Sequence, residues 1–301
     1  MTSKPGGLDP RVNAFRGDLA DRRLEGRVAA PRFVHGEPMA VVAPVAALRG
    51  APSAKAGLLT EALHGEEVQV FDIAEDWAWV QLIGDSYVGY VALDALGARM
   101  SEPTHRVTAL RTFVYPEADL KLPPRSWLPF GARVALGAEV VTRGVAYRPL
   151  TGEPGAVASP HVATLEMPPA GDYVAVAERF VGTPYLWGGK TSLGLDCSAL
   201  VQLSLGAAGL AVPRDTDLQE AALPPLAMGV AAGAELRRGD LVFWPGHVGI
   251  LAAPDRLLHA NAFAMEVAEE PLMPAIQRIA LSGSAVRSIR RPVLPAKRSI
   301  G

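Results

Sequence analysis

The sequence predicts a multidomain protein in which two small all-β barrels are followed by an α+β domain. Residues 38–98 alternate apolar and polar side chains between turn residues, which is typical of the short strands of a small barrel. A repeat of this unit follows it. Beyond residues 166–172, which form the clearest linker, helical apolar spacing comes first and strand-like runs come later. This order favours an α+β domain.

The second β unit is predicted from residues that recur at one constant offset of 66 positions. Gly65, Val68, Gly89 and Val91 recur as Gly131, Val134, Gly155 and Val157. Glycine and valine are common, so chance is the alternative explanation. The constant offset makes two copies of one unit the better interpretation.

These patterns divide the chain into a helical extension over residues 1–34, β units over 35–98 and 99–165, and the α+β domain over 170–292. A short helix is expected over residues 8–28, with Asp9 as its N-cap and Pro10 in its first turn. Beyond the linker, helices are expected over 173–182 and 198–210, and adjacent strands over 239–253 and 256–263.

Composition bounds the function. The 301 residues carry 29 Lys+Arg and 31 Asp+Glu, a net charge of −2, which gives no reason to expect a nucleic acid or an anionic membrane as partner. A single cysteine excludes an intrachain disulfide and a zinc site built from several cysteines. The N-terminal residues lack the apolar core of a signal peptide, and no stretch approaches the roughly 20 apolar residues of a membrane span. A cytoplasmic protein is therefore expected.

The only cysteine, Cys197, lies in "GLDCSALVQ" (194–202), where a buried helix is expected to begin. A helix N-terminus favours a thiolate, so Cys197 is a candidate nucleophile with a lowered thiol pKa. His247 stands at the head of an apolar strand and His259 on the next strand, so His247 is the candidate base and His259 its orienting partner. Three alternatives stay open: an inert packing cysteine, exposed histidines, and a zinc site, although the short paired spacings of zinc sites are absent.

Several separated motifs resemble those of the NlpC/p60 family of papain-like cysteine peptidases, which cut bacterial cell-wall peptides. They are "GTPYLWGG" (182–189), "LDCSALV" (195–201), "PRDTDLQ" (213–219), "RRGDLVFWPGHVGIL" (237–251) and "LLHANA" (257–262). The resemblance covers about residues 170–292 and implies a papain-like fold there. The upstream β units are similar to bacterial SH3-like domains.

The resemblance implies roles for individual residues. Cys197 is the nucleophile, His247 the base, His259 the orienting residue, and Tyr185 lies near the oxyanion. Trp187, Asp196 and Ser198 are expected to help bind substrate. The alternative for Tyr185 and Trp187 is that both are core aromatic residues. Ala199 departs from the family's usual glycine, at little expected cost because alanine favours a helix.

The two SH3-like units and the "RDT" motif resemble a subgroup that cleaves the bond between γ-D-glutamate and a diamino acid in free muropeptides beginning with L-alanine. In that subgroup Asp215, with Thr216, would hold the substrate amine, and Tyr87 would close the cleft. The alternatives are a helix cap or a partner of Arg214 for Asp215, and an ordinary strand aromatic for Tyr87. No metal, cofactor or particular oligomeric state is predicted. Two rival functions remain: an exported hydrolase of intact wall, and a wall-binding protein without catalysis.

Overall fold

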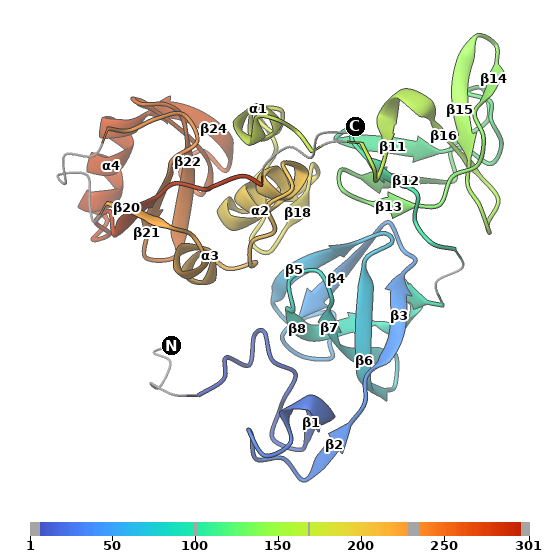
Figure 1. Cartoon of the computed structure of the whole chain (residues 1–301), viewed down its shortest axis with the longest axis horizontal. Helices are drawn as coiled ribbons and strands as arrows, with labels where there is room; N and C mark the ends of the chain where they lie inside the picture. The colour runs from blue at the N-terminus through green and yellow to red at the C-terminus, as the bar shows by residue number, and fades with distance from the viewer. Residues whose placement is uncertain (1–6, 99–100, 168, 228–234, 296–301) are drawn as a thin grey trace. The chain divides into compact units, whose positions relative to one another are not determined.

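Strands dominate the structure, and the helices are few (Figure 1). The computed structural model describes residues 7–98, 101–167, 169–227 and 235–295. The chain divides into an N-terminal unit, residues 1–165, and a C-terminal unit, residues 166–301. Among the described residues, every α-helix belongs to the C-terminal unit. No described helix has the length and apolar character that crossing a bilayer requires.

The helix predicted over residues 8–28 is wrong. This stretch holds the strand β1 (Leu19–Asp21) and the short 3-10 helix η1 (Arg22–Leu24), and β1 pairs in parallel with β2 (Arg32–Val34). The N-terminal extension is therefore extended rather than helical.

The charged residues of the extension explain the error. Asp9 accepts hydrogen bonds from the backbone N–H of Arg11 at 2.9 Å and from its guanidinium, so it closes a turn instead of capping a helix. Arg16 pairs with Asp18 in the same way, two residues apart. Partners on a helix stand three or four residues apart, so charges spaced by two favour extended and turn structure.

The first β subdomain, residues 37–97, is a single antiparallel sheet with the strand order β5-β4-β8-β7-β6-β3-β9. Its elements are β3 (Glu37–Val41), β4 (Val45–Arg49), β5 (Leu58–Leu63), β6 (Glu67–Ala74), β7 (Trp77–Leu82), β8 (Val88–Ala92), the 3-10 helix η2 (Leu93–Ala95) and β9 (Leu96–Gly97). The alternation predicts the inward residues correctly: Val68, Val80 and Val91 are fully buried in one core. Glu75 has a φ of 53° in the turn between β6 and β7.

The second β subdomain, residues 105–164, forms three small sheets, β13-β10-β17, β11-β12 and β14-β15-β16. Its elements are β10 (His105–Val107), β11 (Arg111–Val114), β12 (Ser126–Pro129), β13 (Arg133–Val134), β14 (Val140–Thr142), β15 (Val145–Pro149), β16 (Ala156–Ala158), the 3-10 helix η3 (Ser159–His161) and β17 (Val162–Thr164). Hydrogen bonds recur here at the predicted offset. Gly65 N donates to Val41 O at 2.9 Å, and Gly131 N donates to Val107 O at 3.0 Å.

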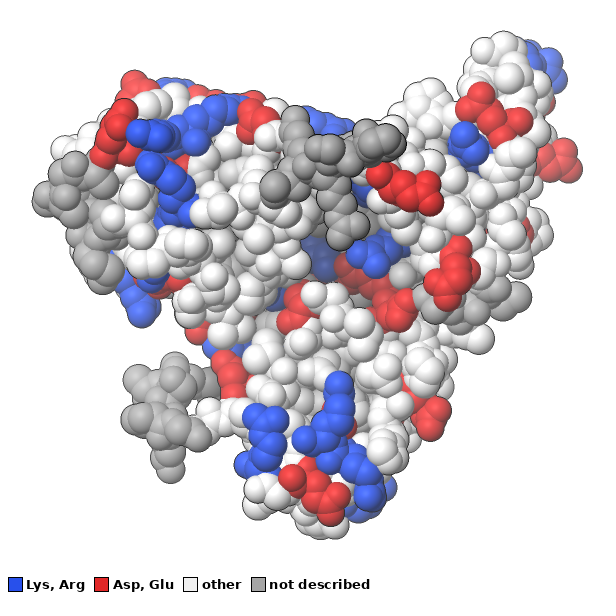
Figure 2. Space-filling model, in the orientation of Figure 1, with Lys and Arg blue, Asp and Glu red and all other residues white. Residues whose placement is uncertain are grey.

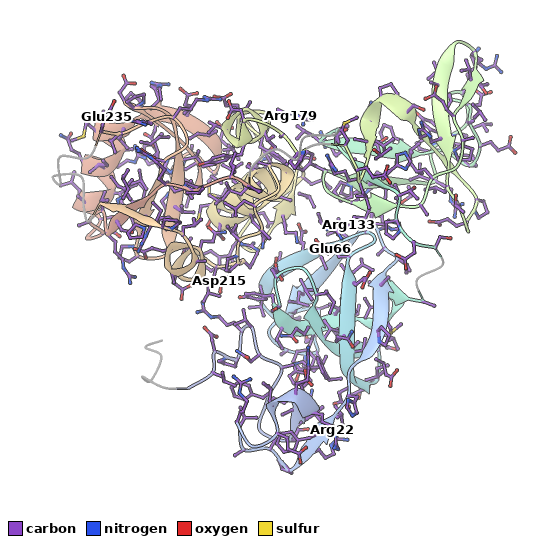
Figure 3. The ribbon with its side chains drawn as sticks, in the orientation of Figure 1. Arg22, Glu66, Arg133, Arg179, Asp215 and Glu235 are labelled. Atoms are coloured by element: carbon purple, nitrogen blue, oxygen red, sulfur yellow. The ribbon has the colours of Figure 1, made fainter. Side chains whose placement is uncertain are left out.

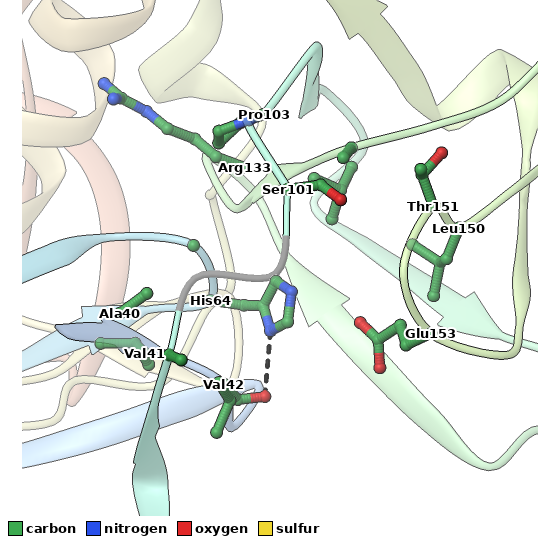
Figure 4. Close-up of a pocket in the computed structure, with 14 residues that line it drawn as sticks. Ala40, Val41, Val42, His64, Ser101, Pro103, Arg133, Leu150, Thr151 and Glu153 are labelled. Atoms are coloured by element: carbon green, nitrogen blue, oxygen red, sulfur yellow. Dashed lines mark hydrogen bonds between the residues drawn. The ribbon is translucent and has the colours of Figure 1, made fainter.

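The two β subdomains meet at a close backbone contact. Arg133 N donates to His64 O at 2.9 Å, and Figure 3 shows Arg133 and Glu66 near each other at this junction. A Cβ on Gly65 would lie 2.1 Å from Arg133 O, and Gly65 has a φ of +78°, so only glycine fits. A pocket beside the junction is lined by His64 and Val42 on one side and by Leu150 on the other (Figure 4). It contains none of the predicted site residues.

The C-terminal unit is built on an antiparallel sheet with the strand order β20-β25-β21-β22-β23-β24. Its elements are α1 (Tyr173–Glu178), β18 (Lys190–Thr191), β19 (Gly194–Leu195), α2 (Cys197–Ala207), α3 (Thr216–Ala222), β20 (Pro225–Ala227), β21 (Leu241–Trp244), β22 (His247–Ala253), β23 (Arg256–Asn261), β24 (Glu266–Pro271), α4 (Leu272–Leu281) and β25 (Ser288–Arg290). The expected helices are confirmed, although α1 ends at Glu178, before the predicted end at 182. The strand expected over 239–253 is divided into β21 and β22, and β22 pairs with β23 as predicted. The helix α4 was not predicted.

Helix α2 holds the centre of this unit. It packs against α1 and against the strands β22 and β23. Eight of its eleven residues are buried, as its apolar sequence predicts. Helix α4 covers the sheet elsewhere, where Leu272 and Ala275 pack against Leu251 and Leu257. The packing of α2 and of α4 on the sheet fixes the start of α2 and the strands β22 to β24, which carry the candidate site.

The surface carries both signs of charge. Figure 2 shows basic and acidic side chains interspersed on the drawn face of each unit, with much uncharged surface between them. The drawn face therefore offers no large area of a single sign.

Candidate active site

Cys197 is the first residue of α2, and Asp196 is the N-cap of that helix. The Asp196 carboxylate accepts hydrogen bonds from Ala199 N at 2.9 Å and from Ser198 Oγ at 3.0 Å. An acidic N-cap satisfies backbone N–H groups that the first turn leaves unpaired. The sulfur is therefore held at the start of a well-anchored helix, as the sequence predicts.

Arg214 anchors this cap from the "PRDTD" motif. Its Nη1 donates to Asp196 Oδ1 at 2.9 Å and its Nη2 to Oδ2 at 2.7 Å, and its side chain is 1% exposed. Arg214 Nη1 also donates to Ser198 Oγ at 2.6 Å. These contacts engage the side chains of Asp196 and Ser198 and favour a positioning role for both. The substrate-binding role predicted for them stays a prediction.

His247 and His259 lie together, as their places on neighbouring strands predict. His247 opens β22 and His259 lies on β23, with His247 Nε2 2.8 Å from His259 Nδ1. His259 is fully buried and His247 partly buried. The second ring nitrogen of His259, Nε2, lies 2.7 Å from Glu270 Oε1. Because His247 uses Nε2 for this contact, Nδ1 is the nitrogen left for chemistry.

Cys197 lies beside the residue that follows His247. The backbone N–H of Val248 acts on the sulfur, and α2 packs on β22. The structure thus brings Cys197, His247 and His259 into one neighbourhood. Their catalytic roles stay predictions that this arrangement favours.

The lowered thiol pKa expected for Cys197 is wrong. Burial, followed by the negative charge of Asp196, raises the pKa of the Cys197 thiol to about 12. The N–H groups of Val248 and Ser198 oppose this rise but do not cancel it. The free energy of removing a thiolate from water is here larger than the stabilisation of that thiolate by the helix N-terminus.

The other groups at the site are also held neutral. Burial, with a contribution from His259, lowers the pKa of His247 to about 3. Burial, together with the charge of Cys197, raises the pKa of the Tyr185 phenol to about 12. The site therefore holds a neutral thiol, a neutral imidazole and a protonated phenol near pH 7. Cys197 and His247 therefore do not form a thiolate–imidazolium ion pair near pH 7 in this arrangement.

The remaining predicted residues are placed as follows. Trp187 is 70% exposed, so the alternative of a core aromatic is wrong for it. Asp215 is the N-cap of α3 and Thr216 its first residue, both half-buried (Figure 3 labels Asp215). Tyr87 packs in the core of the first β subdomain and is 4% exposed. Its cleft-closing role stays a prediction, as does the amine-binding role of Asp215.

Sequence reasoning missed Arg214, Glu270 and Arg278. Arg214 was considered only as a partner of Asp215, its neighbour in sequence, whereas its ion pair is with Asp196. Glu270 is the penultimate residue of β24, and Arg278 of α4 donates to its Oε2 at 2.6 Å. The acid lies two positions from the strand pairing of His259, a signal available only once the strand register is known. Within the described ranges, no group of His, Cys, Asp and Glu is arranged to hold a metal ion.

Comparison with known protein families gives one match in each of the two units. The bacterial dipeptidyl-peptidase Sh3 domain matches residues 48–96, and the NlpC/P60 family matches residues 182–278. A γ-D-glutamyl-L-lysine dipeptidyl-peptidase of Bacillus cereus is 26% identical over 253 residues, which cover 71% of this chain and 71% of that protein. Dipeptidyl-peptidase 6 of Lysinibacillus sphaericus is 34% identical over 94 residues, which cover 31% of this chain and only 33% of that protein.

A solved structure supports the same assignment at the level of fold. The crystal structure of an NlpC/P60 family protein from Bacillus cereus superposes with a TM-score of 0.69 at 21% identity, covering 86% of this chain and 100% of that one. The likeness extends through both units. This chain therefore carries a bacterial dipeptidyl-peptidase Sh3 domain in its N-terminal unit and an NlpC/P60 domain around Cys197.

Proposed function

We propose that this chain is a cysteine peptidase that hydrolyses the bond between γ-D-glutamate and a diamino acid in free muropeptides with an N-terminal L-alanine. The observation that carries the proposal is the placement of Cys197 at the start of a buried helix beside the paired His247 and His259. A relative supports the choice of bond, since it is a γ-D-glutamyl-L-lysine dipeptidyl-peptidase aligned over 71% of its length.

The proposed reaction needs only side chains of this chain and water. Cys197 Sγ attacks the γ-carbonyl carbon of D-glutamate while His247 Nδ1 takes the thiol proton. Tyr185, protonated near pH 7, donates to the oxyanion that forms. The C–N bond then breaks as His247 returns the proton to the leaving amine. Water adds to the thioester with His247 again as base, which releases the glutamyl carboxylate and restores the thiol.

We also propose that the Asp215 carboxylate binds the free α-amine of the substrate. A hydrogen bond between charged groups contributes about 1.5–3 kcal/mol, so losing it should slow cleavage roughly 10- to 150-fold. Tyr87 would limit the length of the peptide on that side. Peptides with a free L-alanine amine arise after release from the wall, so recycling in the cytoplasm belongs to the same proposal.

The proposal extends to the fold. The second β subdomain is a second SH3-like barrel, supported by hydrogen bonds that repeat those of the first at a fixed offset. The C-terminal unit is papain-like, supported by a nucleophile helix packed on an antiparallel sheet that carries the histidines.

Incubation with L-Ala-γ-D-Glu-meso-diaminopimelate and its lysine analogue, followed by mass spectrometry, tests the proposal. Wild type should release L-Ala-γ-D-Glu, and Cys197→Ala should release none. N-acetylation of the substrate should slow wild type but make little difference to Asp215→Asn, with Asp217→Asn on the same helix as the matched control.

The rival functions predict different results. Equal cleavage of free and acetylated peptide, together with release of peptides from intact wall, would favour an exported wall hydrolase. Binding to wall fragments without cleavage would favour a protein without catalysis.

A further inference from the structure

A line of hydrogen bonds runs from the candidate base to the surface of the C-terminal unit. His247 Nε2 lies 2.8 Å from His259 Nδ1, and His259 Nε2 lies 2.7 Å from Glu270 Oε1. Arg278 closes the line, with Nη1 donating to Glu270 Oε2 at 2.6 Å and Nη2 donating to Oε1 at 2.5 Å. The four side chains therefore form one continuous series of hydrogen bonds, so the protonation of each depends on that of its neighbour.

The strand register explains why these groups meet. On the antiparallel strands β23 and β24, His259 pairs with Ala268 and Leu257 pairs with Glu270. Side chains two residues apart on a strand share a face, so His259 and Glu270 are diagonal neighbours on one face of the sheet. Helix α4 begins at Leu272, two residues after Glu270, and packs on β24, which brings Arg278 back over the acid.

The chemistry of an ionised carboxylate decides where the protons lie. An ionised Glu270 can only accept, so His259 Nε2 must carry a proton. A neutral His259 then has an unprotonated Nδ1, which accepts from His247. His247 Nε2 must therefore carry its own proton, and the lone pair of His247 falls on Nδ1.

We propose that Glu270, fixed by Arg278, is the positioning residue that sets the tautomers of both histidines, so that His247 presents an unprotonated Nδ1 for the thiol. This inference rests on the proposed cysteine-peptidase function in its last step only. The tautomers themselves follow from contacts within the C-terminal unit.

The surroundings of Glu270 keep it ionised. The hydrogen bonds from Arg278, joined by that from His259, hold the pKa of Glu270 below its ordinary value. The Arg278 guanidinium in turn lies 4.2 Å from the ring centre of Phe263, which adds a cation–π contact to the ion pair. Because both oxygens of Glu270 already accept from Arg278, the carboxylate has one fixed orientation toward His259.

Glutamine cannot replace this acid. If the amide oxygen of Glu270→Gln faces His259, the amide nitrogen meets Arg278 as a second donor. If the amide is turned, its nitrogen faces His259 Nε2 and favours the opposite tautomer there. Either orientation leaves the protons of the line misplaced or a donor unpaired.

The first experiment reads the tautomers without any substrate. The full chain is labelled with ¹⁵N-histidine, and the ring nitrogen shifts are recorded near pH 7, with His247→Gln and His259→Gln supplying the assignments. Wild type should show a protonated Nε2 and an unprotonated Nδ1 on both rings. Glu270→Gln should move the signals of both rings, whereas Glu269→Gln should not. Glu269 is the matched control, since it lies next to Glu270 on β24 and its carboxylate pairs with Arg256 of β23.

The second experiment measures turnover of the L-Ala-γ-D-Glu-diamino acid peptide. In Glu270→Gln, kcat should fall by roughly 10²-fold or more, within the 10²–10⁴-fold that a general base contributes. KM should change little, because Glu270 does not contact substrate. Arg278→Lys, which keeps the charge but loses the paired geometry, should fall between wild type and Glu270→Gln.

The outcomes separate this inference from the function on which it rests. Unchanged histidine shifts and unchanged kcat in Glu270→Gln would overturn the inference. A decrease in kcat no larger than that of Glu269→Gln would also overturn it. If Glu270→Gln does not fold, the shifts of Arg278→Lys decide, and wild-type tautomers with wild-type kcat there overturn it. A wild type that cleaves no peptide would refute the proposed function, while the shifts would still decide the tautomers.

Discussion

The buried guanidinium of Arg214 donates hydrogen bonds to both carboxylate oxygens of Asp196, the residue that immediately precedes Cys197. The ion pair links the "PRDTD" motif to the N-cap of α2, the helix that begins at Cys197. Arg214 has therefore a structural reason to stand in this motif, separate from any contact with substrate. Its removal leaves a buried carboxylate without its cation, which is among the most destabilising changes a folded domain can suffer.

Arg214→Met should lower the free energy of unfolding by about 3–5 kcal/mol, the range for breaking one side of a buried pair. Urea denaturation of the purified full chain measures the change. Arg237→Met, which removes one partner of an exposed pair with Glu235, is the matched control and should change stability little. A loss in Arg214→Met no larger than that of the control would show that the pair does not hold the helix cap.

The raised thiol pKa of Cys197 predicts slow alkylation. Because only the thiolate reacts, iodoacetamide should modify the folded protein near pH 7 at least about tenfold more slowly than free cysteine, whose pKa is about 8.5. The rate should still be rising above that pH. Cys197 is the only cysteine, so labelling reports one site, and the urea-unfolded chain is the internal control. A folded-state pKa below about 8.5 would contradict this prediction.

The lowered pKa of His247 predicts acid destabilisation. Between about pH 6.5, the ordinary pKa of histidine, and about pH 3, the His247 imidazole binds a proton in the unfolded chain but stays unprotonated in the folded chain. This contribution to stability is full above about pH 6.5 and is lost as the pH falls, at up to about 1.4 kcal/mol per pH unit. Unfolding free energies of His247→Gln should therefore depend less steeply on pH than those of wild type. His35→Gln, at an exposed position, should keep the wild-type slope.

Much of the site follows from local sequence signals. The buried helix that starts at Cys197 is predicted by its apolar composition, and the pairing of His247 with His259 by two short strands in succession. The extension was misassigned because apolar spacing outweighed the charge pairs two residues apart. Helix α4 was missed because Pro271 and Pro274 look like loop residues, although a first helical turn tolerates proline.

The long-range contacts were not predictable in the same way. Glu270 reaches His259 only through the strand register, and Arg278 reaches Glu270 only through the unexpected α4. The thiol pKa required the extent of burial around Cys197, which no neighbouring residue encodes. Sequence patterns thus identify the candidate catalytic residues, whereas the residues that position them depend on tertiary packing.

Two glycine-to-alanine changes should act in opposite directions. A Cβ on Gly249 of β22 would lie 2.5 Å from Leu257 Cδ1 and 3.3 Å from His259 Cβ, so Gly249→Ala forces Leu257 to move and crowds the Cβ of His259. Overpacking of this kind costs about 1–3 kcal/mol, and a displaced His259 should lower kcat as well. Gly206 of α2 is exposed and has no atom within 4 Å of a built Cβ, so Gly206→Ala should stabilise the helix by about 0.5–1 kcal/mol and leave kcat unchanged. Urea denaturation and turnover of both variants test the pair. Gly249→Ala with wild-type stability and kcat would show that β23 yields without disturbing the histidine.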